Sequence, residues 1–200
     1  MGIVKRVANR NIIEMERQIK QGTPLNVLSL EDSVHDFELI SEHLINSGYD
    51  LTIVRVDNKS DFSNLLSINQ YDIVLVDFNL PSFDASEALN IQQLLCPDIP
   101  IICISGFIGE ELAVELLKKG AADYVLKDRI GRLAFAVQSA IESARTKREC
   151  KIAEKALQKK ADELQMYYEL TMGRELKMVE LKKEINDLLK NSGQDLKYFL

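Results

Sequence analysis

Short apolar runs alternate with amphipathic segments through the middle of the chain. The apolar runs are nearly continuous and predict strands of a sheet covered on both faces, over 25–30, 51–56, 71–77, 99–105 and 122–127. The amphipathic segments predict helices over 33–48, 60–68, 85–95 and 109–119, with a last helix from about residue 129. Strands that alternate with such helices are typical of βαβ units. The pattern therefore predicts a three-layer, doubly wound α/β domain with a five-stranded parallel sheet.

Polar side chains stand at the carboxyl ends of four predicted strands. They are Glu31 and Asp32 after the first strand, Asp77 at the third, Ser105 at the fourth and Lys127 at the fifth. In doubly wound folds, sites form at this edge of the sheet, near the point where the strand order reverses. We therefore expect three carboxylates, a hydroxyl and an ammonium to converge there.

The chemistry of these groups points to phosphoryl transfer. Carboxylates held close together repel one another and need a counter-charge. Mg²⁺ supplies one, because it binds through one or two carboxylates, waters and phosphate oxygens. An Asp carboxylate can itself attack phosphorus, and catalysis is then mainly positioning and charge neutralisation. Lys127 would hold a second phosphoryl oxygen, and the Ser105 hydroxyl or a nearby backbone N–H a third.

Four motifs of this region share a familiar order and spacing. LEDS, DIVLVDFNLPSFDA, ISG and YVLKD resemble the receiver domain of two-component response regulators, over about residues 24–147. The resemblance implies a flavodoxin-like sheet with strand order 2-1-3-4-5. It makes Asp77 the phospho-acceptor and Asp32 a direct Mg²⁺ ligand. Glu31 would act beside Asp32 through water, and Asn79 would give its main-chain carbonyl to the metal.

The resemblance also assigns the residues that respond to the phosphoryl group. Ser105 would be the switch hydroxyl, Tyr124 the switch aromatic and Lys127 the invariant-type lysine. The sequence departs mildly from the family in having Ser rather than Thr at 105 and Glu rather than Asp at 31. We expect phosphorylation to survive both departures. The bulk of Phe107 would shield the phosphate from water.

Other proteins with an acidic strand end fit the sequence less well. A flavodoxin needs a Ser/Thr/Gly-rich phosphate loop after the first strand, where Glu31 and Asp32 would repel the FMN phosphate. A haloacid-dehalogenase-type phosphatase needs a second Asp two residues after its nucleophile, where this chain has Asn79. A degenerate receiver that serves only as a docking platform stays open, although the intact set of polar residues argues against it.

Composition limits the partners and the location. Residues 23–147 carry nine Lys/Arg against nineteen Asp/Glu, so a direct nucleic-acid partner is not expected. The three cysteines lack CxxC spacing, which argues against a disulfide framework or a zinc site. No apolar run reaches about 18 residues, so we expect no membrane span and a cytoplasmic protein.

The two ends of the chain predict helices. Residues 1–22 form a basic segment expected to be a short helix, and residues 148–200 predict a helical or coiled-coil extension with a break at Gly173. Beyond that break, an apolar seam steps by three, four and three residues through Met178, Leu181, Ile185 and Leu188. A lone solvated helix is marginal, so we expect this seam to form a homodimer.

The sequence thus predicts a signalling module rather than an enzyme, with residues 24–147 as the receiver. A histidine kinase or a phosphotransfer protein would donate to Asp77 with Mg²⁺ present, and the C-terminal helix would carry the signal. The alternative is a receiver-like scaffold that is not phosphorylated and acts through protein–protein interaction and coiled-coil dimerisation.

Overall fold

The computed structural model describes residues 22–200, apart from 81–82, 107–109, 194, 196 and 199–200. The basic segment predicted for residues 1–22 lies outside these residues except for Gly22, and so does Phe107 with its predicted shielding role. The chain divides into two compact units, Met1–Arg148 and Glu149–Leu200. The predicted site belongs entirely to the first unit.

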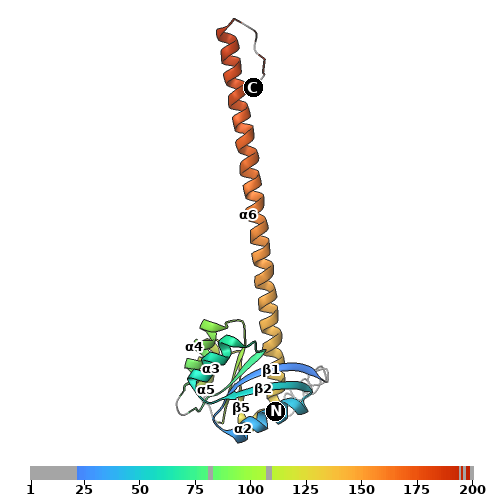
Figure 1. The fold of residues 1–200 in the computed structure, drawn as a ribbon, viewed down its shortest axis with the longest axis vertical. Helices are drawn as coiled ribbons and strands as arrows, with labels where there is room; N and C mark the ends of the chain where they lie inside the picture. The colour runs from blue at the N-terminus through green and yellow to red at the C-terminus, as the bar shows by residue number, and fades with distance from the viewer. Residues whose placement is uncertain (1–21, 81–82, 107–109, 194, 196, 199–200) are drawn as a thin grey trace, which may run out of the picture. The chain divides into compact units, whose positions relative to one another are not determined.

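The first unit is built on a five-stranded sheet in which all paired strands are parallel (Figure 1). The strand order is β2-β1-β3-β4-β5, with β1 at Thr23–Leu30, β2 at Tyr49–Val56, β3 at Ile73–Asp77, β4 at Ile101–Ser105 and β5 at Asp123–Leu126. The predicted fold class and strand order are therefore confirmed. The order reverses between β1 and β3, which puts the switch point beside the ends of those two strands.

Helices cover both faces of the sheet (Figure 1). They are α2 at Val34–Asn46, α3 at Lys59–Ile68, α4 at Ala85–Leu95, α5 at Glu110–Lys118, a 3₁₀ turn η1 at Lys127–Arg132, and α6 at Leu133–Asn191. The last helix thus begins at Leu133, after a 3₁₀ turn, rather than near Arg129 as predicted. Ser33 caps α2, because its hydroxyl accepts the backbone N–H of Asp36 at 3.2 Å.

Alternate side chains of each strand point to opposite faces of the sheet and pack in two separate hydrophobic cores. Leu25 and Val27 of β1 pack with α2 and the first turns of α6, in a cluster that also holds Leu44 and Val137. Leu28 and Leu30 of β1 pack with α3, α4 and α5, in a second cluster. Because both faces are buried there, the central strands β3 and β4 are buried at every position, whereas the edge strand β2 is partly exposed. This double burial also holds the carboxyl ends of the strands rigidly in one row.

The helix α6 runs without interruption through Gly173, so the predicted break there is wrong. A single glycine costs a helix about 1 kcal/mol relative to alanine, which is too little to end a helix that continues well on both sides. The seam residues Met178, Leu181, Ile185 and Leu188 all lie on this one helix and are between 38% and 64% exposed in the single chain. Among the described residues, no helix is both long enough and apolar enough to cross a membrane.

Candidate functional site

The polar residues expected at the strand ends lie at one edge of the sheet. Strand β1 ends at Leu30, immediately before Glu31 and Asp32, and β3 ends at Asp77 itself. Asp77 pairs in register with Ile104, and the next pair along the sheet joins Ser105 to Leu126, the residue before Lys127. The parallel register therefore brings these side chains to the same edge, as the sequence predicts.

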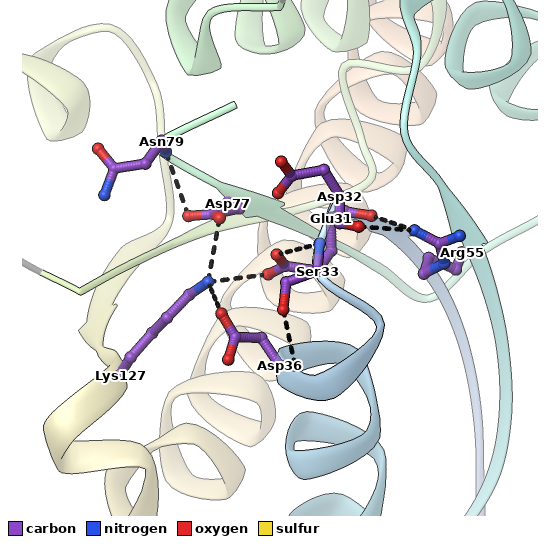
Figure 2. Close-up of polar contacts among 8 residues, drawn as sticks. All are labelled: Glu31, Asp32, Ser33, Asp36, Arg55, Asp77, Asn79 and Lys127. Atoms are coloured by element: carbon purple, nitrogen blue, oxygen red, sulfur yellow. Dashed lines mark hydrogen bonds and ion pairs between the residues drawn. The ribbon is translucent and has the colours of Figure 1, made fainter. Parts of the chain in front are cut away.

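Lys127 lies at the centre of the cluster (Figure 2). Its ammonium donates to Glu31 Oε2 at 3.1 Å, to Asp36 Oδ2 at 2.5 Å and to Asp77 Oδ2 at 3.0 Å. Burial by itself lowers the pKa of this ammonium, but the hydrogen bonds to Asp36 and Asp77 outweigh burial and raise the pKa above its ordinary value. Lys127 therefore stays charged throughout the physiological pH range.

Asp77 is buried and held at both carboxylate oxygens. Its side chain is 5% exposed. Oδ1 accepts the backbone N–H of Asn79 at 3.1 Å, and Oδ2 accepts from Lys127. The backbone N–H of Phe78 donates to Ile104 O at 2.8 Å, which fixes the chain just after the strand. The carboxylate of Asp77 is thus fixed in position before any ligand arrives.

Glu31 is the most deeply buried acid of the cluster, with its side chain 1% exposed. Burial and the nearby charge of Asp77 raise the pKa of this carboxyl from 4.5 to about 7, against the hydrogen bonds from Lys127 and the Ser33 N–H. The Ser33 N–H donates to Glu31 Oε1 at 3.1 Å. Lys127 alone therefore does not neutralise the acidic cluster.

The three carboxylates predicted to hold Mg²⁺ fit a divalent cation. One oxygen each from Glu31, Asp32 and Asp77 lies within 4.8 Å of the other two. Asp32 is exposed, whereas Glu31 and Asp77 are buried, so one side of the cluster opens to water. A hard cation with several retained waters suits this mixture of buried and exposed oxygens. Its positive charge would offset the repulsion between Glu31 and Asp77 that contributes to the raised pKa of Glu31.

Two residues of the site were not predicted. Asp36, in the first turn of α2, contacts Lys127. Arg55 of β2 donates from Nη1 to the backbone carbonyls of Glu31 at 2.9 Å and of Asp32 at 3.2 Å, and so ties down the acidic loop (Figure 2). The only sequence signal for Arg55 is that it is a lone charge inside the apolar run LTIVRV.

The two predicted switch residues lie on β4, the strand beside β3, and on β5, one strand further. Ser105 is buried at the end of β4. Tyr124 is half-buried on β5, packed against the core under α3, α4 and α5. The Arg132 guanidinium lies 6.0 Å from the Tyr124 ring centre, and its Nη2 donates to both carboxylate oxygens of Asp123, at 2.7 and 3.0 Å. Tyr124 is thereby linked to the residue that immediately precedes α6.

Comparison with known proteins identifies the family of this domain. Residues 27–138, more than half of the chain, match the profile of the response regulator receiver domain. The chain belongs to this family. The resemblance carried by the four motifs is therefore confirmed, and residues 27–138 are a receiver of the kind used in two-component systems.

The curated relatives of this receiver are regulatory proteins. The response regulator protein FleR of Pseudomonas aeruginosa is 29% identical over 101 residues, which cover 50% of this chain and 21% of FleR. The regulatory protein VirG of Agrobacterium fabrum is 34% identical over 134 residues, which cover 64% of this chain and 52% of VirG. The chain thus spans only about a fifth of FleR and half of VirG.

Solved receiver domains share the fold. The receiver domain of the sensor histidine kinase PA1611 of Pseudomonas aeruginosa, solved with a magnesium ion coordinated in its active site cleft, has a TM-score of 0.52 and 22% identity, over 60% of this chain and 99% of that one. The receiver domain of a putative LuxO repressor from Vibrio parahaemolyticus has a TM-score of 0.57 and 23% identity, over 64% and 97%. At this level of identity the two structures support the fold.

Proposed function

We propose that this receiver is a phospho-acceptor of a two-component phosphorelay and that Asp77 takes the phosphoryl group. The observation that carries the proposal is the position of the Asp77 carboxylate. It lies buried at the switch point of the sheet, 3.0 Å from the ammonium of Lys127 and beside the acidic oxygens of Glu31 and Asp32. A histidine kinase or a phosphotransfer protein would be the donor.

In the transfer, a carboxylate oxygen of Asp77 forms a bond to the phosphorus of a phosphohistidine. The P–N bond breaks, and its electron pair leaves with the imidazole of the donor. Negative charge on the phosphoryl oxygens is stabilised by the Lys127 ammonium, which already lies at Asp77. The Ser105 hydroxyl, at the end of the neighbouring strand β4, donates to another of these oxygens.

Asp32 and Asp77 would hold Mg²⁺ through their carboxylates and Glu31 through a water, together with the main-chain carbonyl of Asn79. When bound, the ion neutralises the acidic cluster and polarises a phosphoryl oxygen. The oxygens within 4.8 Å of one another support this assignment. Arg55 keeps the acidic loop in place by binding the Glu31 and Asp32 carbonyls.

The signal would leave the site through Tyr124 and α6. Ser105 and Tyr124 would shift toward the phosphoryl group, and the Arg132 pair with Asp123 would pass this shift to the start of α6. In this account the chain is a signalling module that acts in the cytoplasm, rather than an enzyme with an output reaction. The excess of acidic residues over 23–147 argues against direct binding to nucleic acid.

The proposed function is tested by adding beryllofluoride, a phosphoryl mimic, with Mg²⁺ and recording backbone amide NMR shifts. We expect the wild type to show shifts near Asp77 and Lys127, and Asp77→Ala to show none. Asp50→Ala, an exposed acid on β2, is the matched control and should respond like the wild type. An unresponsive wild type would rule out the phospho-acceptor and favour the scaffold that is not phosphorylated.

We further propose that the seam of Met178, Leu181, Ile185 and Leu188 joins two copies of the chain. The double substitution of Leu181→Lys and Ile185→Lys should convert a dimer of the full chain into a monomer, because it puts like charges into an apolar seam. Lys183→Glu on the outer face of the same helix should leave the dimer intact. Sedimentation velocity measures the outcome, and a monomeric wild type would contradict the proposal.

A further inference from the structure

Asp36 makes the shortest of the three ion pairs of Lys127, and nothing in the proposed chemistry uses it. Its Oδ2 lies 2.5 Å from Lys127 Nζ, against 3.0 Å for Asp77 and 3.1 Å for Glu31. Asp36 comes from the first turn of α2, where the Ser33 cap fixes its backbone. Figure 2 shows its carboxylate reaching the ammonium from the side opposite Asn79.

The three contacts use the whole donor capacity of the lysine. An ammonium has three N–H donors, and Lys127 gives one each to Glu31, Asp36 and Asp77. A phosphoryl oxygen on Asp77 can therefore bind Lys127 at full strength only if a carboxylate gives way. Asp36 also places a further negative charge close to the position that a phosphoryl group would take.

Asp36 differs from the other two partners of Lys127. Glu31 and Asp77 are 1% and 5% exposed and belong to the group of oxygens that fits a cation, whereas Asp36 is 30% exposed and lies outside that group. A cavity of about 260 Å³ adjoins the pair, with Asp36, Leu39, His43, Lys127 and Ile130 among its lining residues. Asp36 therefore has both water and space into which its carboxylate can move.

We propose that Asp36 is a positioning residue that holds Lys127 in the resting receiver and competes with the phosphoryl group for its ammonium. The proposal rests on the proposed function, because it gives Lys127 a phosphoryl oxygen as its alternative partner. In the resting state Asp36 neutralises the lysine and so weakens its attraction for an anion. Phosphorylation of Asp77 releases Asp36 from Lys127, which reports the event to the first turn of α2.

Isothermal titration of the full chain with beryllofluoride, at a Mg²⁺ concentration that saturates each variant, tests this competition. Asp36→Asn keeps the shape of the side chain and removes its charge, so we expect beryllofluoride to bind about three to ten times more tightly than to the wild type. Asp36→Glu keeps the charge and should stay near the wild type. Glu38→Gln makes the same charge change on the exposed face of α2 and should leave the affinity unchanged.

The direction of the change separates competition from damage, because a distorted site binds more weakly. Equal or weaker binding by Asp36→Asn, or equal tightening by Glu38→Gln, would overturn the role of Asp36 and leave the proposed function intact. A wild type that binds no beryllofluoride in saturating Mg²⁺ would overturn both. Thermal unfolding of each variant shows that the compared proteins are folded.

Discussion

Replacement of Lys127 by alanine is expected to lower the phosphorylated fraction of the protein by about 100-fold or more after brief incubation with acetyl phosphate and Mg²⁺. Lys127 is the only cation that the described residues place in contact with Asp77, and it is held there by two further carboxylates. Without it, the phosphoryl oxygens would face Glu31 and Asp36 with no ammonium between them. Intact-protein mass spectrometry measures the fraction directly.

Lys118→Ala is the matched control for this experiment, since Lys118 is an exposed lysine in the last turn of α5. It should become phosphorylated at the rate of the wild type. If Lys127→Ala accumulated the phosphoryl group as fast as Lys118→Ala, Lys127 would not stabilise the phosphoryl oxygens during transfer.

Glu31 should make the metal-free receiver less stable as the pH rises from 4.5 to about 7. Its pKa is 4.5 when exposed and about 7 in the fold, so the folded state binds the proton more tightly. The stabilisation from this proton is fully present below pH 4.5 and is lost as the pH rises through about 7. The loss is on the order of 3 kcal/mol in the free energy of unfolding.

Glu31→Gln removes this titration, because an amide stays neutral. In a chelator, we expect the variant to be more stable than the wild type by on the order of 3 kcal/mol above pH 7, and nearly equal to it below pH 4.5. Urea unfolding at a series of pH values measures the difference, with Glu38→Gln as an exposed control. A constant difference across the series would show that folding does not raise the pKa of Glu31.

The periodicity of the chain predicted the fold well because both sheet faces are buried. Continuous apolar runs such as IVLVD and IICIS are too short for a buried helix and fit a strand that is covered on both sides. The end of each run also located the polar edge, because the carboxyl ends of parallel strands meet at the same edge of the sheet. Asp77 and Lys127 could therefore be placed at one edge from the sequence alone.

Contacts between elements could not be predicted in this way. Asp36 is an ordinary acid in the first turn of a helix, where the helix dipole already favours it, so nothing in the sequence pairs it with Lys127. Arg55 reaches its backbone partners only because β2 lies beside β1. The break predicted at Gly173 was wrong for a different reason. Glycine often ends a helix, but the residues on both sides of Gly173 favour helix strongly enough for α6 to continue.

The most direct test of the central claim is to locate the phosphoryl group. The full chain is incubated with acetyl phosphate and Mg²⁺, reduced with borohydride to convert an aspartyl phosphate to homoserine, and sequenced by tandem mass spectrometry. We expect the converted residue at Asp77, and no conversion when Mg²⁺ is removed by a chelator. Conversion at Asp32 or another acid, or no conversion at all in the wild type, would contradict Asp77 as the phospho-acceptor.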